Sequence, residues 1–169
     1  MPMFKSVSPY EITGNTFDMI DNQWMLITAG SEEKFNMMTA SWGGLGIMWG
    51  RPVATCYIRP QRYTKEFVDA GEYLTLTFFG DDQRGMLRMC GSKSGRDCDK
   101  VAESGLSPVF DKAAPYYEEA KLVLVCRKLY CQPIDPECFL DPSIAENYAA
   151  GDYHLTYICE ITEVLVKED

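Results

Sequence analysis

The sequence lacks several features that would identify a common function directly. It has one histidine, His154, no C-x-x-C pair, no G-x-G-x-x-G loop and no apolar run near the ~18 residues of a membrane-spanning helix. Lysine and arginine number 16 against 25 aspartates and glutamates, which gives a formal net charge of −9. Nucleic-acid binding needs a basic face, so this balance argues against that class of protein.

The cysteines give a second exclusion. There are seven of them, an odd number, and several lie in apolar runs typical of strands. This pattern indicates a reducing compartment, the cytosol, and residues 1–6 lack the apolar core of a secretory signal. Cys126, Cys131 and Cys138 could be imagined as metal ligands, but Cys126 lies in a β-branched run and His154 is distant. We therefore expect no metal site.

The pattern of strands predicts the fold class. The composition, 46% hydrophobic and 24% charged, is typical of a globular protein, and we expect a single domain over residues 1–169. The segments expected to be strands are 23–30, 35–42, 52–59, 73–79, 121–131 and 154–166, with a glycine-rich break at 43–46. Short helices are expected at 65–70, 81–89 and 142–148, and a further short helical piece is expected after the loop at 90–100 and ends at residue 104. Strands without regular βαβ alternation favour a mainly β, antiparallel barrel with helical insertions.

The most informative stretch is Asn36-Met37-Met38-Thr39-Ala40-Ser41-Trp42, at the end of a predicted strand. It combines small hydroxyl groups with backbone amides on a strand edge, which suits the polar rim of a flat ring. Alternate strand residues share a face, so Thr39 and Ser41 project together, and we expect them on the ligand side. The alternative is that both are ordinary exposed strand residues. Apolar contacts to the ring would come from Met37, Met38, Ala40 and Trp42.

A second stretch, Arg59-Pro60-Gln61-Arg62-Tyr63-Thr64-Lys65-Glu66-Phe67, predicts a phosphate site. It ends a strand and opens a helix, whose first backbone amides and a guanidinium fork both suit phosphate oxygens. No acidic residue lies between positions 51 and 65. We expect Arg59, Arg62 and Thr64 to contact the phosphate, with Gln61 and Tyr63 beside them and Thr64 as the N-cap of the helix. The alternative places the arginines in surface ion pairs with Glu66 or Asp69.

These motifs together identify a family. The order N-x-x-T-x-S, glycine patch, R-P-x-R-Y-T-x-E-F and Y-L-x-L-x-F, followed by the loop at 91–100 and Gly151-Asp152-Tyr153-His154, resembles the flavin reductase-like family of FMN-binding split β-barrels, which includes flavoredoxin. The resemblance extends from about Trp24 to Val166. It implies a homodimer that holds FMN at or near the subunit interface. It also implies that electrons come from a nicotinamide nucleotide, NAD(P)H, or from another redox protein.

Two further groups of residues gain candidate roles beside this cofactor. Ser92, Ser94, Arg96 and Lys100 could reach the FMN phosphate or ribityl hydroxyls, and a solvated loop is the alternative. His154 could close over the flavin or donate to a nucleotide substrate, as a tentative catalytic residue, and a structural role is the alternative.

The leading functional hypothesis is an FMN-dependent oxidoreductase that passes electrons to flavin or another small acceptor. No acid–base dyad or nucleophile is evident, and hydride transfer between stacked rings depends mainly on orientation. The alternative is an FMN-containing electron-transfer protein without NAD(P)H reductase activity. A third possibility is a barrel that has lost the cofactor.

Overall fold

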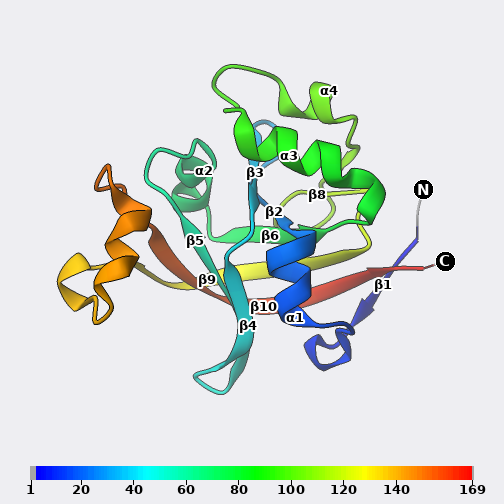
Figure 1. Cartoon of the computed structure of the whole chain (residues 1–169). Helices are drawn as coiled ribbons and strands as arrows, with labels where there is room; N and C mark the ends of the chain where they lie inside the picture. Colours follow the sequence, from blue (N-terminus) through cyan, green and yellow to red (C-terminus); the bar gives the residue numbers. More distant parts are fainter. Residues whose placement is uncertain (1–2, 169) are drawn as a thin grey trace.

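A central antiparallel sheet dominates the computed structural model, which describes residues 3–168. Its strands are β1 (Phe4–Val7), β2 (Met25–Gly30), β3 (Phe35–Ala40), β4 (Gly43–Met48), β5 (Arg51–Ile58), β6 (Tyr73–Phe78), β9 (Leu122–Pro133) and β10 (Leu155–Lys167). They follow the order β3-β2-β6-β9-β10-β5-β4, and β1 pairs with β10 (Figure 1). A separate small sheet pairs β7 (Pro108–Val109) with β8 (Tyr116–Tyr117).

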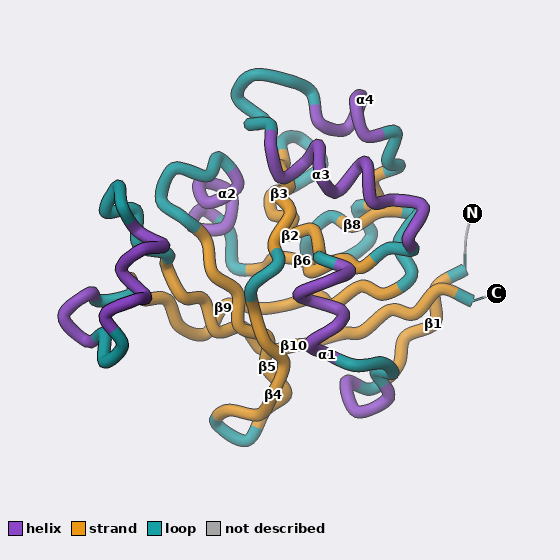
Figure 2. Tube along the Cα trace, in the orientation of Figure 1, coloured by secondary structure: helices purple, strands orange, loops and turns teal. Residues whose placement is uncertain are grey.

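The helical segments are short and lie around the sheet, as the purple segments of Figure 2 show. They are α1 (Thr16–Asp18) with a following π-helical turn (Met19–Gln23), α2 (Thr64–Ala70), α3 (Arg84–Ser92), α4 (Lys100–Ser104), and 3₁₀ turns at Pro9–Glu11, Asp81–Gln83, Pro136–Cys138 and Pro142–Tyr148. Of the helices within residues 3–168, none is long and apolar enough to cross a membrane.

The long strand β10 organises the sheet. It pairs with β9 along its length, with β5 through its first half and with β1 through its second half. Its alternation was predicted from the sequence and is confirmed: Tyr157, Cys159 and Ile161 are buried in the same core cluster. A strand that joins three neighbours fixes the position of both sheet ends relative to each other.

Both faces of the middle strands are covered. Leu122, Leu124 and Cys126 of β9 belong to one hydrophobic cluster, and the alternating residues Val123 and Val125 belong to another. The second cluster includes side chains of α3 and β8, which pack on the outer face of the sheet. This explains why β9 is a continuous apolar run rather than an alternating one.

One predicted break is wrong, because the glycine patch at 43–46 is part of β4. This strand pairs with β5 from Gly43 opposite Cys56 to Met48 opposite Arg51. Glycine is usually depleted in strands, but it occurs where backbones approach closely. A Cβ on Gly43 would lie 2.9 Å from the Thr55 carbonyl oxygen, so this position requires glycine.

The second predicted helix is shifted. The sequence indicated residues 81–89, whereas a 3₁₀ turn over Asp81–Gln83 precedes α3, which continues to Ser92. Apolar side chains explain the extension, since Met86, Leu87 and Cys90 all lie buried in the cluster beneath α3. The predicted loop at 90–100 therefore begins after Ser92.

Candidate functional site

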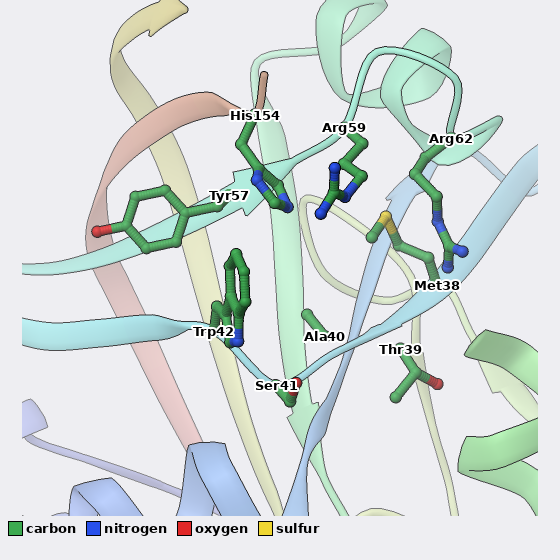
Figure 3. A pocket seen from close by; sticks show the side chains of 9 residues that line it. All are labelled: Met38, Thr39, Ala40, Ser41, Trp42, Tyr57, Arg59, Arg62 and His154. Carbon is green, nitrogen blue, oxygen red and sulfur yellow. The ribbon is translucent and has the colours of Figure 1, made fainter. Parts of the chain in front are cut away.

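A cavity of about 270 Å³ lies where the two end strands of the sheet come together. β3 and β4 are these end strands, and only Ser41 and Trp42 connect them. The walls of the cavity come from β3, the connection Ser41–Trp42, β5, the turn after β5 and the residue before β10 (Figure 3). The lining residues are Met38, Thr39, Ala40, Ser41, Trp42, Tyr57, Arg59, Arg62 and His154.

The β3 wall presents its apolar face to the cavity. Figure 3 shows Met38 and Ala40 pointing toward the side of Arg59, while Thr39 points the opposite way. The Thr39 hydroxyl donates a hydrogen bond to the carbonyl oxygen of Leu87 in α3. Thr39 still lines the cavity, but its hydroxyl is bonded to α3, so the expectation that it contacts a ligand together with Ser41 stays a prediction. α3 covers the outer face of β3, and a half-buried hydroxyl there bonds to the helix backbone.

Asn36 and Thr64 bond to each other rather than lining the cavity. The Asn36 side-chain amide donates to the Thr64 hydroxyl oxygen at 2.9 Å, and both residues are buried. Thr64 was predicted as an N-cap, but α2 begins at Thr64 itself and Tyr63 occupies the N-cap position without a side-chain bond. A buried amide needs a partner, which explains why the threonine turns inward. Met37 is also buried, in the cluster beneath α3.

Arg59 is already paired. Its guanidinium donates to the Asp152 carboxylate at 2.8 Å and to the Asn147 carbonyl oxygen at 3.0 Å. The Gln61 amide donates to the same carboxylate oxygen at 2.8 Å. These two donors, Gln61 first, hold the pKa of Asp152 below its usual value. The sequence allowed an ion pair for Arg59 but named the wrong acids, because Glu66 pairs with Arg96 and Asp69 pairs with Lys65.

Arg62 has an unused donor. Its Nη1 donates to the Gly91 carbonyl oxygen at 2.9 Å, whereas Nη2 is buried and has no hydrogen-bond partner within residues 3–168. Burial lowers the pKa of this guanidinium. A buried charged donor without a partner is costly and therefore needs an explanation. It is an unsatisfied donor on a residue that lines the cavity.

Tyr63 of the predicted phosphate stretch and Arg96 of the loop at 91–100 do not line the cavity. The Tyr63 ring packs against Phe67 and under the Arg96 guanidinium, 4.6 Å from its centre. Arg96 itself donates to Glu66 and to the carbonyl oxygen of Gln61.

In the segment 91–100, the side chains of Ser92, Ser94 and Lys100 form hydrogen bonds with other groups of the protein. The Ser92 hydroxyl donates to the Met89 carbonyl oxygen, and the Ser94 hydroxyl accepts from the Arg96 amide. Lys100 is buried and donates to two backbone carbonyl oxygens. The cavity is lined by none of the four predicted residues Ser92, Ser94, Arg96 and Lys100, so their contacts with a ligand stay predictions. Sequence spacing placed them near the phosphate stretch but gave no information on their partners.

His154 closes the cavity opposite β3. Its Nδ1 lies 2.8 Å from the Tyr148 hydroxyl, and its ring centre lies 5.1 Å from that of Trp42. Burial, and then the positive charge of Arg59, lower the pKa of His154, so the imidazole is neutral at pH 7. A neutral ring can donate from one nitrogen while the other accepts.

The sequence analysis missed Tyr57, whose ring lines the cavity from β5 while its hydroxyl points away (Figure 3). The signal was available, since Tyr57 lies two residues before Arg59 and alternate residues of an extended segment share a face. Within residues 3–168, no group of three or more histidine, cysteine or acidic side chains could hold a metal ion.

The chain is similar to known flavin-binding proteins in sequence and in fold. The family model "Flavin reductase like domain" matches residues 18–169. An FMN-binding domain of a flavin reductases-like enzyme from Shewanella baltica is 16% identical, with a TM-score of 0.70 over 98% of this chain and 78% of that chain. Flavoredoxin from Methanosarcina acetivorans is 19% identical, with a TM-score of 0.69 over 96% and 77%.

A protein described as a flavin reductase with a split barrel domain, from Shewanella frigidimarina, is 17% identical, with a TM-score of 0.68 over 91% and 73%. No curated protein sequence matches this chain. The structural matches confirm the predicted split β-barrel.

Proposed function

Because this chain belongs to the flavin reductase-like family, as its motifs predicted, we propose that it binds FMN and works as an oxidoreductase. In this proposal it accepts electrons from NAD(P)H or a redox partner and passes them to flavin or another small acceptor. One observation carries the proposal: the buried Nη2 of Arg62, without a partner in the described chain, lies on a residue that lines the cavity. A phosphate monoester supplies the anionic oxygens that such a donor needs.

The other walls fit the remaining parts of FMN. β3 is an end strand, so one of its backbone edges lies outside the β-ladder of residues 3–168 and offers amides and carbonyls to a polar ring edge. Met38, Ala40 and Trp42 provide apolar contact to the ring face. We propose that Arg62 holds the phosphate and that Ser41 contributes at the ring end.

The available volume suits a cofactor and a second ring together. The cavity of about 270 Å³ is slightly smaller than ordinary ligand pockets, which are roughly 300–1,000 Å³. A second cavity of about 530 Å³ shares Ser41, Trp42 and Tyr57 with it. We propose that the two cavities together hold the flavin and leave room for an electron donor or acceptor.

Bound FMN would supply the exchange of hydride or single electrons, so the protein needs no nucleophile of its own. The residues of the chain would bind FMN, orient its ring and shield it from water. The neutral His154 closes the cavity, and with Nδ1 accepting from Tyr148 its Nε2 would be a donor toward a nucleotide or acceptor. We propose this positioning of a second ligand as the role of His154.

An absorption spectrum and an FMN titration of the full chain test the proposal. We expect the wild-type protein to bind FMN, and Arg62→Ala to weaken binding by about a hundredfold, as expected when one partner of a buried charged pair is removed. Arg88→Ala is the matched control, because Arg88 is an exposed arginine on α3 and should leave affinity unchanged. A colourless protein that fails to retain added FMN would contradict the proposal and select the flavin-free alternative.

The electron donor separates the enzyme from the electron carrier. Rapid mixing of the FMN-loaded protein with NADH or NADPH should bleach the flavin absorption within seconds if the chain is a reductase. Bleaching by a reduced ferredoxin-type protein, but by neither nucleotide, would select the flavoredoxin-like carrier. We propose that this chemistry takes place in the cytosol, where its seven cysteines would stay reduced.

The homodimer expected from the resemblance remains a proposal, and the β4–β5 hairpin supports it. This hairpin projects from the barrel at the bottom of Figure 1, and Ile47, Met48 and Trp49 are exposed on it. Trp49 and Gly50 form its turn with φ of +52° and +69°. Such a turn favours asparagine and glycine, so a tryptophan there is strained and needs a reason. We propose that Trp49 contacts a second copy of the chain.

Trp49→Asn tests this interface, because asparagine suits the turn and removes the apolar contact. We expect the variant to fold normally. Its dimer should have a higher dissociation constant than that of the wild type, so monomers should already form at higher protein concentrations, as measured by light scattering after size-exclusion chromatography. A wild-type monomer, or a variant that dimerises equally well, would contradict it.

A further inference from the structure

The buried ammonium group of Lys100 connects β3 to the end of α3. Lys100, the first residue of α4, is 4% exposed. Its Nζ donates to the Met37 carbonyl oxygen of β3 at 2.8 Å and to the Cys90 carbonyl oxygen of α3 at 2.8 Å. β3 carries the cavity-lining residues that precede Ser41, so Lys100 ties this strand to the end of α3.

Arg62 binds the same helix end. Its Nη1 donates to the carbonyl oxygen of Gly91, the residue after Cys90. Both carbonyls belong to the last turn of α3, where backbone oxygens lack intrahelical donors and cations are favoured. The position of Arg62 relative to β3 is therefore defined through α3 and Lys100.

The charge of Lys100 is not compensated by a carboxylate. The titratable groups that face it are Cys90, Cys98 and Arg62, and neither Lys100 nor Arg62 forms an ion pair within residues 3–168. Burying a lysine without a carboxylate partner is unfavourable. Arg62 lines the cavity, and Lys100 bonds to the carbonyl oxygen of Met37, the residue before the lining residue Met38, so an anion in the cavity would interact favourably with both charges.

We infer that Lys100 is a positioning residue for the phosphate end of the flavin site, which it serves by fixing β3 and Arg62 to the same turn of α3. The inference rests on the proposed function. It differs from the contact expected from the sequence, because Lys100 does not line the cavity and acts through Met37 and the end of α3.

The inference predicts a pH dependence of FMN binding. Burial lowers the pKa of Lys100 to about 8. A bound phosphate would raise it, since a nearby negative charge favours the ammonium form. FMN affinity should then be constant below pH 8 and fall as the pH rises above it. Of the facing groups, Arg62 stays charged in this range, and burial raises the pKa of Cys90 to about 11.

The test compares FMN dissociation constants of the full chain between pH 6.5 and 9.5. Lys100→Met should weaken FMN binding by about tenfold or more at pH 7 and abolish the decline above pH 8. Lys93→Met is the matched control, since Lys93 is an exposed lysine directly after α3 that pairs with Glu103. Cys98→Ser should keep the decline, which excludes the thiol as its source.

A second measurement needs no cofactor. Hydrogen exchange of the cofactor-free protein should be faster at the amides of Met38 and Thr39 in Lys100→Met than in the wild type, with the β9 amides unchanged. If Lys100→Met fails to fold, Lys100→Gln replaces it, because its amide still donates but carries no charge to titrate. Wild-type affinity, pH profile and exchange in these variants would overturn the inference. If the wild-type chain does not bind FMN, the proposed function fails, and the exchange comparison still decides whether Lys100 positions β3.

Discussion

The two arginine-bearing walls of the cavity are built in opposite ways. On one wall, Arg59 lies against a carboxylate, that of Asp152, which also accepts from Gln61. On the other, Arg62 donates to a backbone carbonyl, as does Lys100 beyond the cavity lining, and neither has a carboxylate partner within residues 3–168. The first wall is already neutralised, whereas the second gains from an added anion. The difference predicts different roles for these two arginines, which lie three residues apart.

The largest expected effect comes from removing the uncompensated charge. Arg62→Ala should lower the free energy of unfolding of the FMN-loaded protein strongly, but that of the cofactor-free protein by less than about 1 kcal/mol. Loss of the bond to Gly91 and relief of an unpaired buried charge nearly cancel. Thermal unfolding with and without FMN measures both, and an equal loss in both states would make Arg62 a structural residue.

A smaller effect is expected on the outer face of β3. Thr39→Val should destabilise the protein by about 1 kcal/mol, because the hydrogen bond from the Thr39 hydroxyl to the Leu87 carbonyl oxygen is lost. FMN affinity should stay within about threefold of the wild type. Denaturant unfolding and an FMN titration provide the two values. A large loss of affinity would support the expectation that Thr39 contacts the ligand.

His154, which lies near Arg59 and Asp152, should make the free energy of unfolding depend on pH. Burial and Arg59 lower its pKa, so the unfolded chain binds the proton more readily. Its contribution to stability is therefore complete above the unfolded value of about 6.5 and is lost as pH falls through the lower folded value. Tyr148, Arg59 and Asp152 are the groups that face it. The slope of unfolding free energy below pH 6.5 should be smaller in His154→Gln; an equal slope would contradict this origin.

The smallest effect is expected at the ion pair of Arg59 and Asp152, whose side chains are partly exposed. Asp152→Asn should leave FMN affinity nearly unchanged, because we propose that the phosphate binds Arg62 and not Arg59, and a partly exposed pair contributes little to stability. The pKa of Asp152 is lowered, so its stabilisation is present above pH 4 and disappears as pH falls further. The difference in unfolding free energy between wild type and variant should shrink accordingly. A large change in FMN affinity would show that the Arg59 wall binds the phosphate.

The sequence predicted the fold where local patterns decide it. The alternation in β10, the polar turn between β2 and β3, and Pro60 after β5 depend on neighbours in the chain and are found where expected. β4 was missed because its glycines argue locally for a break. The requirement for Gly43 comes from Thr55 on the paired strand, which the local pattern does not contain.

The structure brings many of the predicted site residues together, although their contact with a ligand stays a prediction. The predicted residues that line one cavity are Met38, Thr39, Ala40, Ser41, Trp42, Arg59, Arg62 and His154. Which arginine is free depends on Asp152, which lies far along the chain, and the burial of Lys100 depends on the packing of α3 against β3. Such long-range compensation of charge is decided by the tertiary structure and leaves no pattern at a fixed spacing.

A crystal structure of the full chain with FMN is the most direct test of the account. It should place a phosphate oxygen within hydrogen-bond distance of Arg62 Nη2, about 2.7–2.9 Å, with Arg59 still bonded to Asp152. A phosphate bound to Arg59 instead, with Arg62 Nη2 still without a partner, would contradict the account.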